Sequence, residues 1–378
     1  MSIKKHLIAS LLFYVSLTST LTANVTQAPF AYLFDSQTNT VLFERNADQL
    51  MPPASMTKMM TIYMLFDAIK KGKVSLNDEF TVSEKAWRKG GTKMFVEVGK
   101  KVKVEDLIRG VIVQSGNDAC IVIAEALGQD EDYFAQLMTQ KARDLGLKKS
   151  TFKNASGWPH PDHKVTAKEL GMLAAAIIKD FPEYYHYFAE TTFTYNNIKQ
   201  YNRNRLLGNL AGADGLKTGH TEEAGYGLTA SAKRGEQRLI AVVNGLADDS
   251  ARIEEAKKLL SWGFQEFENV KLFQKGQKID EVNVWAGEAN TIDLSIDEDT
   301  ILTLPRGSQD KLKIKLQYTT PLPAPINKGD VIAHLDIILD KKTLATIPLQ
   351  AHQNIAELGF FAKKWYGLKQ MFSQIFTP

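Results

Sequence analysis

The sequence predicts an α+β fold built on an antiparallel sheet, followed by a small all-β domain and a C-terminal amphipathic helix. Three observations lead to this prediction. Strand patterns stand at both ends of residues 30–267, with helical patterns between them. Short alternating runs broken by Gly, Pro and Asp then take over, and the last residues repeat apolar side chains at helical spacing.

Composition limits the class of protein. The chain has 378 residues and 44% hydrophobic content, which is typical of a globular protein with two domains. Its net charge of +3, from 46 basic and 43 acidic residues, gives no case for a nucleic-acid partner. The single cysteine, Cys120, cannot form an internal disulfide, and we expect it to be a small buried apolar residue.

Residues 1–23 have the pattern of a secretory signal peptide. Lys4 and Lys5 precede an apolar run over 7–17, and small and polar residues lead to Ala23, where we expect cleavage. The run is short for a membrane-spanning helix, and no cysteine follows it that would indicate lipoprotein processing. The sequence therefore predicts an exported protein.

Residues 24–267 form the predicted α+β domain. The segment FAYLFDSQTNTVLFERN is typical of a hairpin, and GYGLTASAKRGEQRLIAVVNGL of two strands joined at Arg234-Gly235-Glu236. Thr166 and Glu169 match a capping box. Helical patterns between the strand pairs cover residues 104–113, 118–127, 131–145 and 167–178.

Residues 268–352 form the predicted all-β domain. Its alternating runs include TIDLSID, KLKIKLQY and DVIAHLDIILD.

Residues 353–378 are predicted to form an amphipathic helix. One face would carry Leu358, Phe361, Trp365, Leu368, Phe372 and Ile375, while Lys363, Lys364 and Lys369 gather on another. Such a helix lies in a membrane interface rather than spanning the bilayer. The alternative is a terminal helix docked on the all-β domain.

The stretch PPASMTKMMT places Ser55 and Lys58 three residues apart, where an apolar helix begins that Gly72 would end. By itself the pattern is short, and Lys58 would more simply extend to solvent while Ser55 caps the helix. Its meaning depends on partners elsewhere in the chain.

Two further motifs supply these partners. Ser115-Gly116-Asn117 precedes the helical run DACIVIAEAL, and Lys217-Thr218-Gly219 precedes the second strand pair. Each is an ordinary cap or strand end when taken alone. In the order S-x-x-K, S-x-N and K-T-G they form the signature of active-serine enzymes that attack penicillin and D-alanyl-D-alanine peptides.

The chain resembles the low-molecular-mass penicillin-binding proteins that act as D-alanyl-D-alanine carboxypeptidases. The resemblance extends over GGTKMFVEVG, VQSGNDAC, YNRN, DGLKTGHTEEAGYGL and KKLLSWGF, and over the all-β domain and tail. It implies a catalytic domain of the serine β-lactamase and penicillin-binding-protein type. In SGWPHPDHKVTA the chain has Val165 where similar proteins tend to have serine, which leaves the role of His163 open.

An acyl transfer needs a nucleophile and a base. Ser55 is the predicted nucleophile and Lys58 the predicted base. A free lysine has a pKa near 10.4, so Lys58 must be made neutral, and burial beside the second cation Lys217 would lower its pKa.

The remaining roles follow from the resemblance. Ser115 would relay a proton to the leaving amine, and Asn117 would hold the substrate backbone. An oxyanion hole would come from the backbone N–H groups of Ser55 and His220. The terminal carboxylate would be met by Lys217, Thr218 and Arg252, with Gly219 letting the strand approach the substrate. Arg252 is the weaker assignment, since it would also suit the protein surface beside Glu254 and Glu255.

Two other classes of protein deserve comparison. His160, Asp162 and His163 cluster closely enough for a metal peptidase, but the sequence has no H-E-x-x-H spacing, and we predict neither a metal nor a cofactor. A cell-wall binding protein with an inactive site would lack a motif residue, and none is missing.

Within the serine class, a β-lactamase of class A would need an E-x-x-L-N loop to activate water, and the sequence has none. An endopeptidase that cuts cross-linked peptidoglycan shares all three motifs and stays open. The expected partners are a peptidoglycan pentapeptide, β-lactams and a membrane surface, with the protein in the periplasm on the outer face of the inner membrane. The third residue of the stem peptide, the oligomeric state and the pH optimum are left open.

Overall fold

A computed structural model of the chain describes residues 25–365. The described chain divides into two compact units, the first ending at Glu266 and the second beginning at Phe267. The predicted signal peptide lies outside the described residues, as do Leu368, Lys369, Phe372 and Ile375 of the predicted tail.

The first unit is built on a five-stranded sheet in the order β2-β1-β9-β8-β7, with every neighbouring pair antiparallel. Its strands are β1 (Phe30–Asp35), β2 (Thr40–Arg45), β7 (Ala213–Thr221), β8 (Gly225–Arg234) and β9 (Gln237–Leu246). Both predicted strand pairs are confirmed, and β1 pairs with β9, so the two ends of the domain meet in one sheet.

A helical block lies between β2 and β7 in the sequence, as predicted. The helices of this unit are η2 (Ala54–Thr57), α1 (Lys58–Lys70), α2 (Glu84–Arg88), α3 (Val104–Ile112), α4 (Asn117–Gly128), α5 (Glu131–Asp144), α6 (Ala167–Asp180), η3 (Tyr185–Ala189) and α7 (Asp249–Glu266). At the start of α6, Thr166 Oγ1 accepts from the backbone N–H of Glu169. The reciprocal half of the predicted capping box is absent there, because the Glu169 carboxylate binds Lys149 N and Ser150 Oγ instead.

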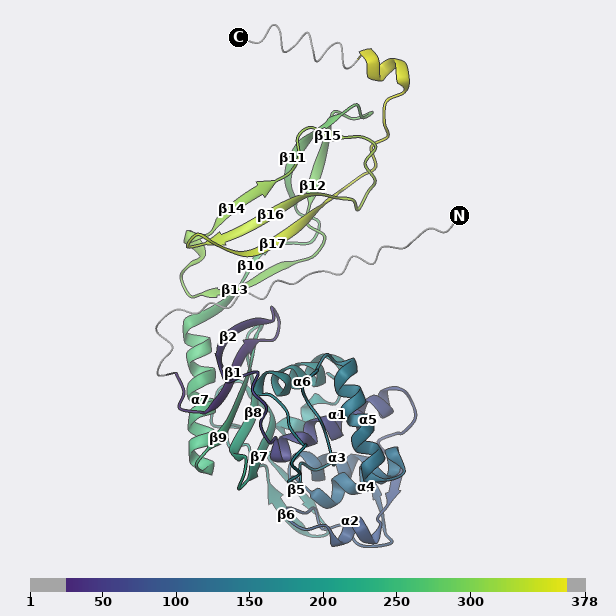
Figure 1. Ribbon diagram of the computed structural model, residues 1–378, viewed down its shortest axis with the longest axis vertical. Helices are drawn as coiled ribbons and strands as arrows, with labels where there is room; N and C mark the ends of the chain where they lie inside the picture. Colours follow the sequence, from purple (N-terminus) through teal and green to yellow (C-terminus); the bar gives the residue numbers. More distant parts are fainter. Residues whose placement is uncertain (1–24, 366–378) are drawn as a thin grey trace. The chain divides into compact units, whose positions relative to one another are not determined.

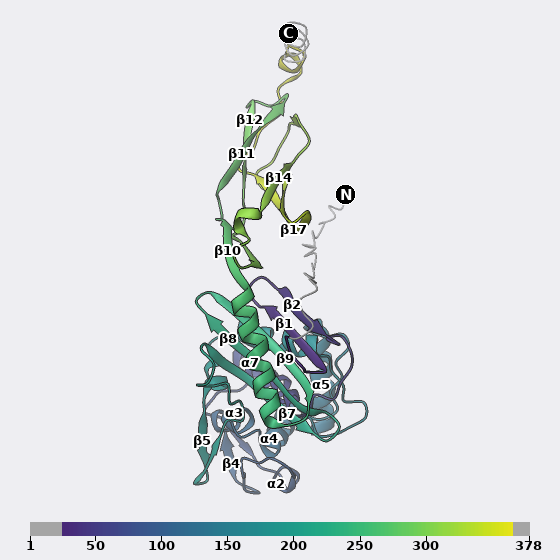
Figure 2. The ribbon, with the colours of Figure 1, turned by 90° about the vertical axis from the view of Figure 1, so that its left-hand side faces the viewer.

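Helices cover both faces of the sheet. Helix α7 lies along one face (Figure 2), and α6 packs on the other together with the rest of the helical block (Figure 1). Side chains of β1 contact the helices on both faces. An added Cβ at Gly263 of α7 would touch Leu33, whereas one at Gly171 of α6 would touch Tyr32 and Phe34. Successive strand residues point to opposite faces, so β1 is buried on both sides.

Two small ribbons, which the sequence did not predict, complete the first unit. Strand β3 (Glu79–Thr81) pairs with β4 (Lys101–Lys103), and β5 (Thr192–Tyr195) pairs with β6 (Ile198–Tyr201). Strands of three or four residues contain too few alternations to show a period.

The second unit is all-β, as predicted. Its short ribbon joins β10 (Phe267–Phe273) to β13 (Thr300–Pro305), and η4 (Gln309–Lys311) follows. Its larger sheet has the order β14-β16-β17-β12-β11-β15. The strands of this sheet are β11 (Lys278–Trp285), β12 (Thr291–Ser295), β14 (Lys313–Gln317), β15 (Leu322–Pro323), β16 (Val331–Leu339) and β17 (Lys342–Ala351). Alternate residues such as Val282, Leu294 and Leu335 form its core.

The second unit continues past Ala351. Ile355 pairs with Ile326, and Leu358 N donates to Ala286 O at 2.8 Å. A helix then begins at Phe360 and continues to the end of the described residues. Over residues 25–365, no helix is both long enough and apolar enough to cross a membrane.

Candidate active site

The turn that carries Ser55 is the buried start of α1. Residues 54–57 form the 3-10 helix η2, and α1 continues from Lys58 without a break. Ala54 has a φ of 47°, in the left-handed region that a non-glycine residue adopts only when its surroundings impose it. Met56 and Thr57 are fully buried, so the turn is held on both sides while Ser55 stays partly accessible.

Lys58 is fully buried and does not extend to solvent. Its Nζ donates to Ser55 Oγ at 2.7 Å, to Asn117 Oδ1 at 2.8 Å and to the backbone O of Ser156 at 2.7 Å. These three contacts use all three N–H groups of an ammonium. The spacing that predicted a Ser55–Lys58 contact is confirmed, and the same nitrogen reaches the second motif at Asn117.

Burial is the main reason that the pKa of Lys58 is lowered to about 8, and the charges of Arg203 and Lys89 act in the same direction. The pKa of Lys217 is lowered well below its ordinary value, first by burial and then by the charges of Lys58, Arg203 and Arg252. The expected lowering of the Lys58 pKa is therefore present. The cations Arg203 and Lys89 add to this lowering, and the mutual repulsion of the Lys58 and Lys217 ammonium groups favours a neutral amine in the pair.

The second motif lies where the loop before α4 meets the cleft. Ser115 is 2% exposed with a φ of 57°, and its backbone O accepts from Thr92 Oγ1. Asn117 is the first residue of α4, and its Nδ2 donates to Gly90 O at 2.9 Å. The backbone of Ser115 and the side chain of Asn117 are thus fixed by the segment that begins GGTK.

The third motif lies on the edge strand β7, with Lys217 and Thr218 almost fully buried. An added Cβ at Gly219 would lie 2.8 Å from Pro53 O and 3.3 Å from Ala54 Cβ. A glycine is therefore required here so that β7 can lie against the turn that carries Ser55. We expected it to make room for the substrate, but its nearest neighbours are the turn itself.

Arg252 is buried at the start of α7 and is not a surface residue beside Glu254. It is 5% exposed, its Nη1 donates to Gly219 O at 3.2 Å, and its guanidinium lies 5.5 Å from the Tyr226 ring. Asp249 pairs with it. Within residues 25–365 its Nε finds no hydrogen-bond partner, which leaves one buried donor of the guanidinium unsatisfied.

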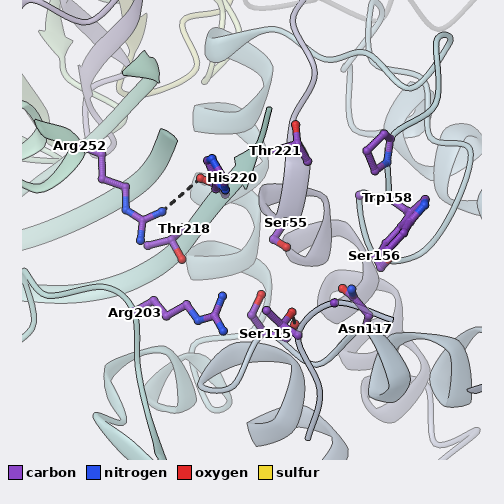
Figure 3. A pocket seen from close by; sticks show the side chains of 15 residues that line it. Ser55, Ser115, Asn117, Ser156, Trp158, Arg203, Thr218, His220, Thr221 and Arg252 are labelled. Atoms are coloured by element: carbon purple, nitrogen blue, oxygen red, sulfur yellow. Dashed lines mark hydrogen bonds between the residues drawn. The ribbon is translucent and has the colours of Figure 1, made fainter. Parts of the chain in front are cut away.

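The three motifs line one cleft of about 310 Å³. Figure 3 shows Ser55 near its centre, with Arg252, Thr218 and Arg203 on one side and Asn117, Ser156 and Trp158 on the other. The cleft therefore has a cationic end and an end with an aromatic wall, and the hydroxyl group of Ser55 lies between them.

Several lining residues were not identified as site residues from the sequence. Arg203 belongs to the YNRN segment, which could have indicated it as a site residue. The next residue, Asn204, is 1% exposed, and its Nδ2 donates to Gly215 O at 2.9 Å. This contact fixes the loop that carries Arg203 to β7. Gly91, Thr92, Ser156 and Trp158 also line the cleft. Ser156 and Trp158 belong to none of the three motifs, and they reach the site from a loop about one hundred residues beyond Ser55.

The remaining sequence candidates are placed as follows. The His220 ring is exposed at the cleft and stacks on Tyr226, with 3.8 Å between ring centroids. Cys120 is fully buried in α4. Both ring nitrogens of His163 are engaged, by Thr57 and by the backbone of Lys153. Over residues 25–365 there is no group of three His, Cys, Asp or Glu side chains that could hold a metal ion.

The fold and the cleft define a class of protein: the active-serine enzymes that carry S-x-x-K, S-x-N and K-T-G around one nucleophile. The family profile described as D-alanyl-D-alanine carboxypeptidase matches residues 18–247, and the profile of the C-terminal domain of penicillin-binding protein 5 matches residues 267–357. The chain belongs to the D-alanyl-D-alanine carboxypeptidase family, and it is a serine hydrolase.

Known proteins and solved structures are similar to this chain over most of its length. The chain is 41% identical to the D-alanyl-D-alanine carboxypeptidase DacC of Escherichia coli, over 91% of this chain and 88% of that protein. It resembles the crystal structure of penicillin-binding protein 5 from Haemophilus influenzae with a TM-score of 0.81 and 39% identity, over 88% of this chain and 98% of that one. Penicillin-binding protein D2 of Listeria monocytogenes, solved in an ampicillin-bound form, matches with a TM-score of 0.58 and 30% identity, over 63% of this chain and 98% of that one.

Proposed function

We propose that this enzyme removes the terminal D-alanine from peptidoglycan pentapeptides through an acyl-enzyme on Ser55, and that penicillins acylate the same hydroxyl. The observation that carries the proposal is the 2.7 Å contact between Ser55 Oγ and the buried Nζ of Lys58. A lysine whose pKa is about 8 is partly neutral near pH 7, so Lys58 takes the proton as Ser55 attacks the carbonyl carbon.

The proton then goes to the leaving amine. Ser115 lines the cleft beside Asn117, and its hydroxyl relays the proton from Lys58 to the nitrogen of the departing D-alanine. Asn117 holds the substrate backbone through its amide while its Oδ1 keeps Lys58 in place. Water then attacks the acyl-enzyme and releases the shortened peptide.

The cationic end of the cleft takes the terminal carboxylate. Thr218 and Arg252 line this end, Lys217 lies beside Thr218 on β7, and the guanidinium of Arg252 is suited to a carboxylate. Arg203 adds positive charge on the same side. The backbone N–H groups of Ser55 and His220 stabilise the oxyanion, so the exposed imidazole of His220 need not take part in the reaction.

The proposed location is the periplasm, on the outer face of the inner membrane. The predicted signal peptide would export the chain, and the predicted C-terminal helix would bind the membrane surface. Supporting this, Phe360, Phe361 and Trp365 are 68%, 85% and 73% exposed at the end of the described residues, an unusual cluster of aromatic side chains for a surface that faces only water.

One assay tests the function. The purified enzyme is given a muramyl pentapeptide and, separately, a cross-linked peptide dimer, and released D-alanine and dimer cleavage are measured independently. We expect D-alanine from the pentapeptide and little cleavage of the dimer. Preferential cleavage of the dimer would assign an endopeptidase, and fast turnover of penicillin would assign a β-lactamase.

A further inference from the structure

The loop of residues 153–163 lies directly against the turn that carries the nucleophile. Ala155 O accepts from Thr61 Oγ1 at 2.6 Å, and Ser156 O accepts from Lys58 Nζ at 2.7 Å. An added Cβ at Gly157 would lie only 1.8 Å from Ala54 O. The contacted residues Ala54, Lys58 and Thr61 are three or four positions apart and so lie on one side of the helical turn. The loop therefore covers that side of the catalytic turn.

The loop keeps its own shape through Asn154. The Oδ1 atom of Asn154 accepts from the backbone N–H groups of Ser156, Gly157 and Trp158 at 3.2, 2.8 and 2.9 Å. Its Nδ2 donates to Trp158 O at 2.9 Å. These bonds fix residues 154–158 relative to one another, so a contact beside this segment influences where the Ser156 carbonyl lies.

His163 makes such a contact. Its ring is 2% exposed, packs edge-on against Phe152, and lies with Nε2 3.0 Å from Thr57 Oγ1. The backbone N–H of Lys153 donates to Nδ1 at 3.3 Å. Nδ1 is therefore an acceptor without a proton, which places the proton on Nε2 and makes Nε2–H the donor to Thr57.

We propose that His163 is a positioning residue for the proposed acylation of Ser55. Its Nε2–H group fixes the loop of residues 153–163 to Thr57, and the loop in turn holds the Ser156 carbonyl against Lys58 Nζ. Because the His163–Thr57 hydrogen bond joins two side chains, Thr57→Val removes it without cutting a backbone contact of the loop, whereas a change of His163 also removes the acceptor of the Lys153 N–H. The burial that keeps this imidazole neutral is consistent with the role, since it lowers the pKa of His163 to about 3.

The inference rests on the proposed function and predicts an effect on one step only. The cationic end of the cleft lies on the other side of Ser55 from the loop (Figure 3), so ligand binding before acylation should depend on His163 much less than acylation does, although Trp158 of the loop lines the cleft. A misplaced Ser156 carbonyl would instead let Lys58 Nζ shift away from Ser55 Oγ. Small shifts of a reacting group reduce rates strongly without changing affinity.

The test separates these steps with a fluorescent penicillin in stopped-flow experiments on the full mature chain. We expect His163→Phe to slow the acylation rate constant by about tenfold, with the pre-acylation dissociation constant unchanged within about twofold. Thr57→Val should have a similar effect from the other partner. Both changes break the Thr57 contact, and only His163→Phe also removes the acceptor of the Lys153 N–H, so the double variant should be no slower than His163→Phe alone.

Two further variants complete the design. His163→Gln can still donate to Thr57 and should recover most of the lost rate. His160→Phe changes an exposed histidine of the same loop and should acylate like the unmodified enzyme.

The inference is overturned if His163→Phe acylates at the normal rate, if the loss lies in binding alone, or if the effects of His163→Phe and Thr57→Val multiply. If His163→Phe does not fold, the acylation rates of Thr57→Val and His163→Gln test the inference instead. A normal rate for Thr57→Val, or a loss in binding alone, would overturn it. A failure of the unmodified enzyme to be labelled at Ser55 would be a different result, because it would overturn the proposed function itself.

Discussion

At the scale of single residues, the site combines a buried amine with a hydroxyl group. Lys58 has no exposed surface, yet every N–H of its ammonium finds an acceptor. Burial favours the neutral amine, while the three acceptors favour the ammonium. Burial is the main cause of the Lys58 pKa of about 8, which leaves the amine close to the point at which it can accept a proton from Ser55.

Replacing Ser55 by Ala should abolish covalent labelling by a fluorescent penicillin. The change removes one oxygen atom from a partly exposed side chain, so the thermal unfolding midpoint should stay within a few degrees of the original, about 3 °C or less. Gel labelling and thermal unfolding check the two parts. Labelling that persisted in the folded variant would exclude Ser55 as nucleophile.

Acylation should depend on pH with the sign set by Lys58. The base must be neutral, so the acylation rate constant should rise with pH up to about 8 and level off above it. Well below this value it should fall about tenfold per pH unit. Lys58→Arg should show no such rise and almost no acylation, because a guanidinium stays protonated. A flat profile for the unmodified enzyme over roughly the three pH units below 8 would contradict the role of Lys58.

The sequence allowed part of this chemistry to be predicted. The Ser55–Lys58 contact follows from helical spacing, and Asn117 could be placed there through the ordered set of three motifs. The Ser156 carbonyl could not be predicted, because any residue has a backbone oxygen and only the fold decides which one meets Lys58. The His163–Thr57 contact could not be predicted either, because only the fold brings these two distant side chains together.

At the scale of elements, the position of β7 depends on a residue without a side chain. An added Cβ at Gly219 meets the backbone oxygen of Pro53, which cannot rotate away as a flexible side chain would. The strand must lie this close to bring Thr218 and the turn with Ser55 to the same cleft. Packing between a strand and a helical turn therefore sets the width of the active site.

Gly219→Ala should push β7 away from the turn. We expect acylation by penicillin to fall by more than about tenfold, together with a destabilisation of about 1–3 kcal/mol from overpacking. Gly359→Ala is a matched control, since its added Cβ would meet nothing within 4 Å. Denaturant unfolding and labelling rates measure both effects. Normal labelling of Gly219→Ala would mean that the turn can absorb the extra atom.

Elements with a clear period could be predicted, and elements fixed by tertiary contacts could not. The hairpin of β1 and β2 and the helices α3 to α6 repeat apolar residues over enough positions to show their type. The ribbons β3–β4 and β5–β6 are too short for that. At α6 the sequence indicated the cap at Thr166, but not that Glu169 would bind Ser150 instead of completing the box.

At the scale of the whole molecule, the second unit ends in an exposed aromatic surface. Pairing continues through Leu358, after which Phe360, Phe361 and Trp365 face solvent in the described helix. Lys363 pairs with Glu357 and lies 5.2 Å from the Trp285 ring, so the start of the helix is held to the second unit. The aromatic side chains remain free to meet another surface, which favours membrane binding over docking on the all-β domain.

The last prediction concerns this tail. Cutting the chain before Glu357 would remove residues that pair within the second unit, so the informative truncation ends at Gly359. Burying the apolar face at a bilayer interface, with lysines near anionic headgroups, is expected to contribute several kcal/mol, roughly 3–6 after the helix is ordered. The truncated enzyme should release D-alanine at the original rate but no longer sediment with anionic vesicles. A full-length variant with Phe360, Phe361 and Trp365 changed to Ser is the matched control, because it keeps the lysines and should bind far more weakly than the original. If the truncated enzyme stayed with the vesicles, or if the full-length enzyme failed to bind them, the tail would not be the membrane anchor.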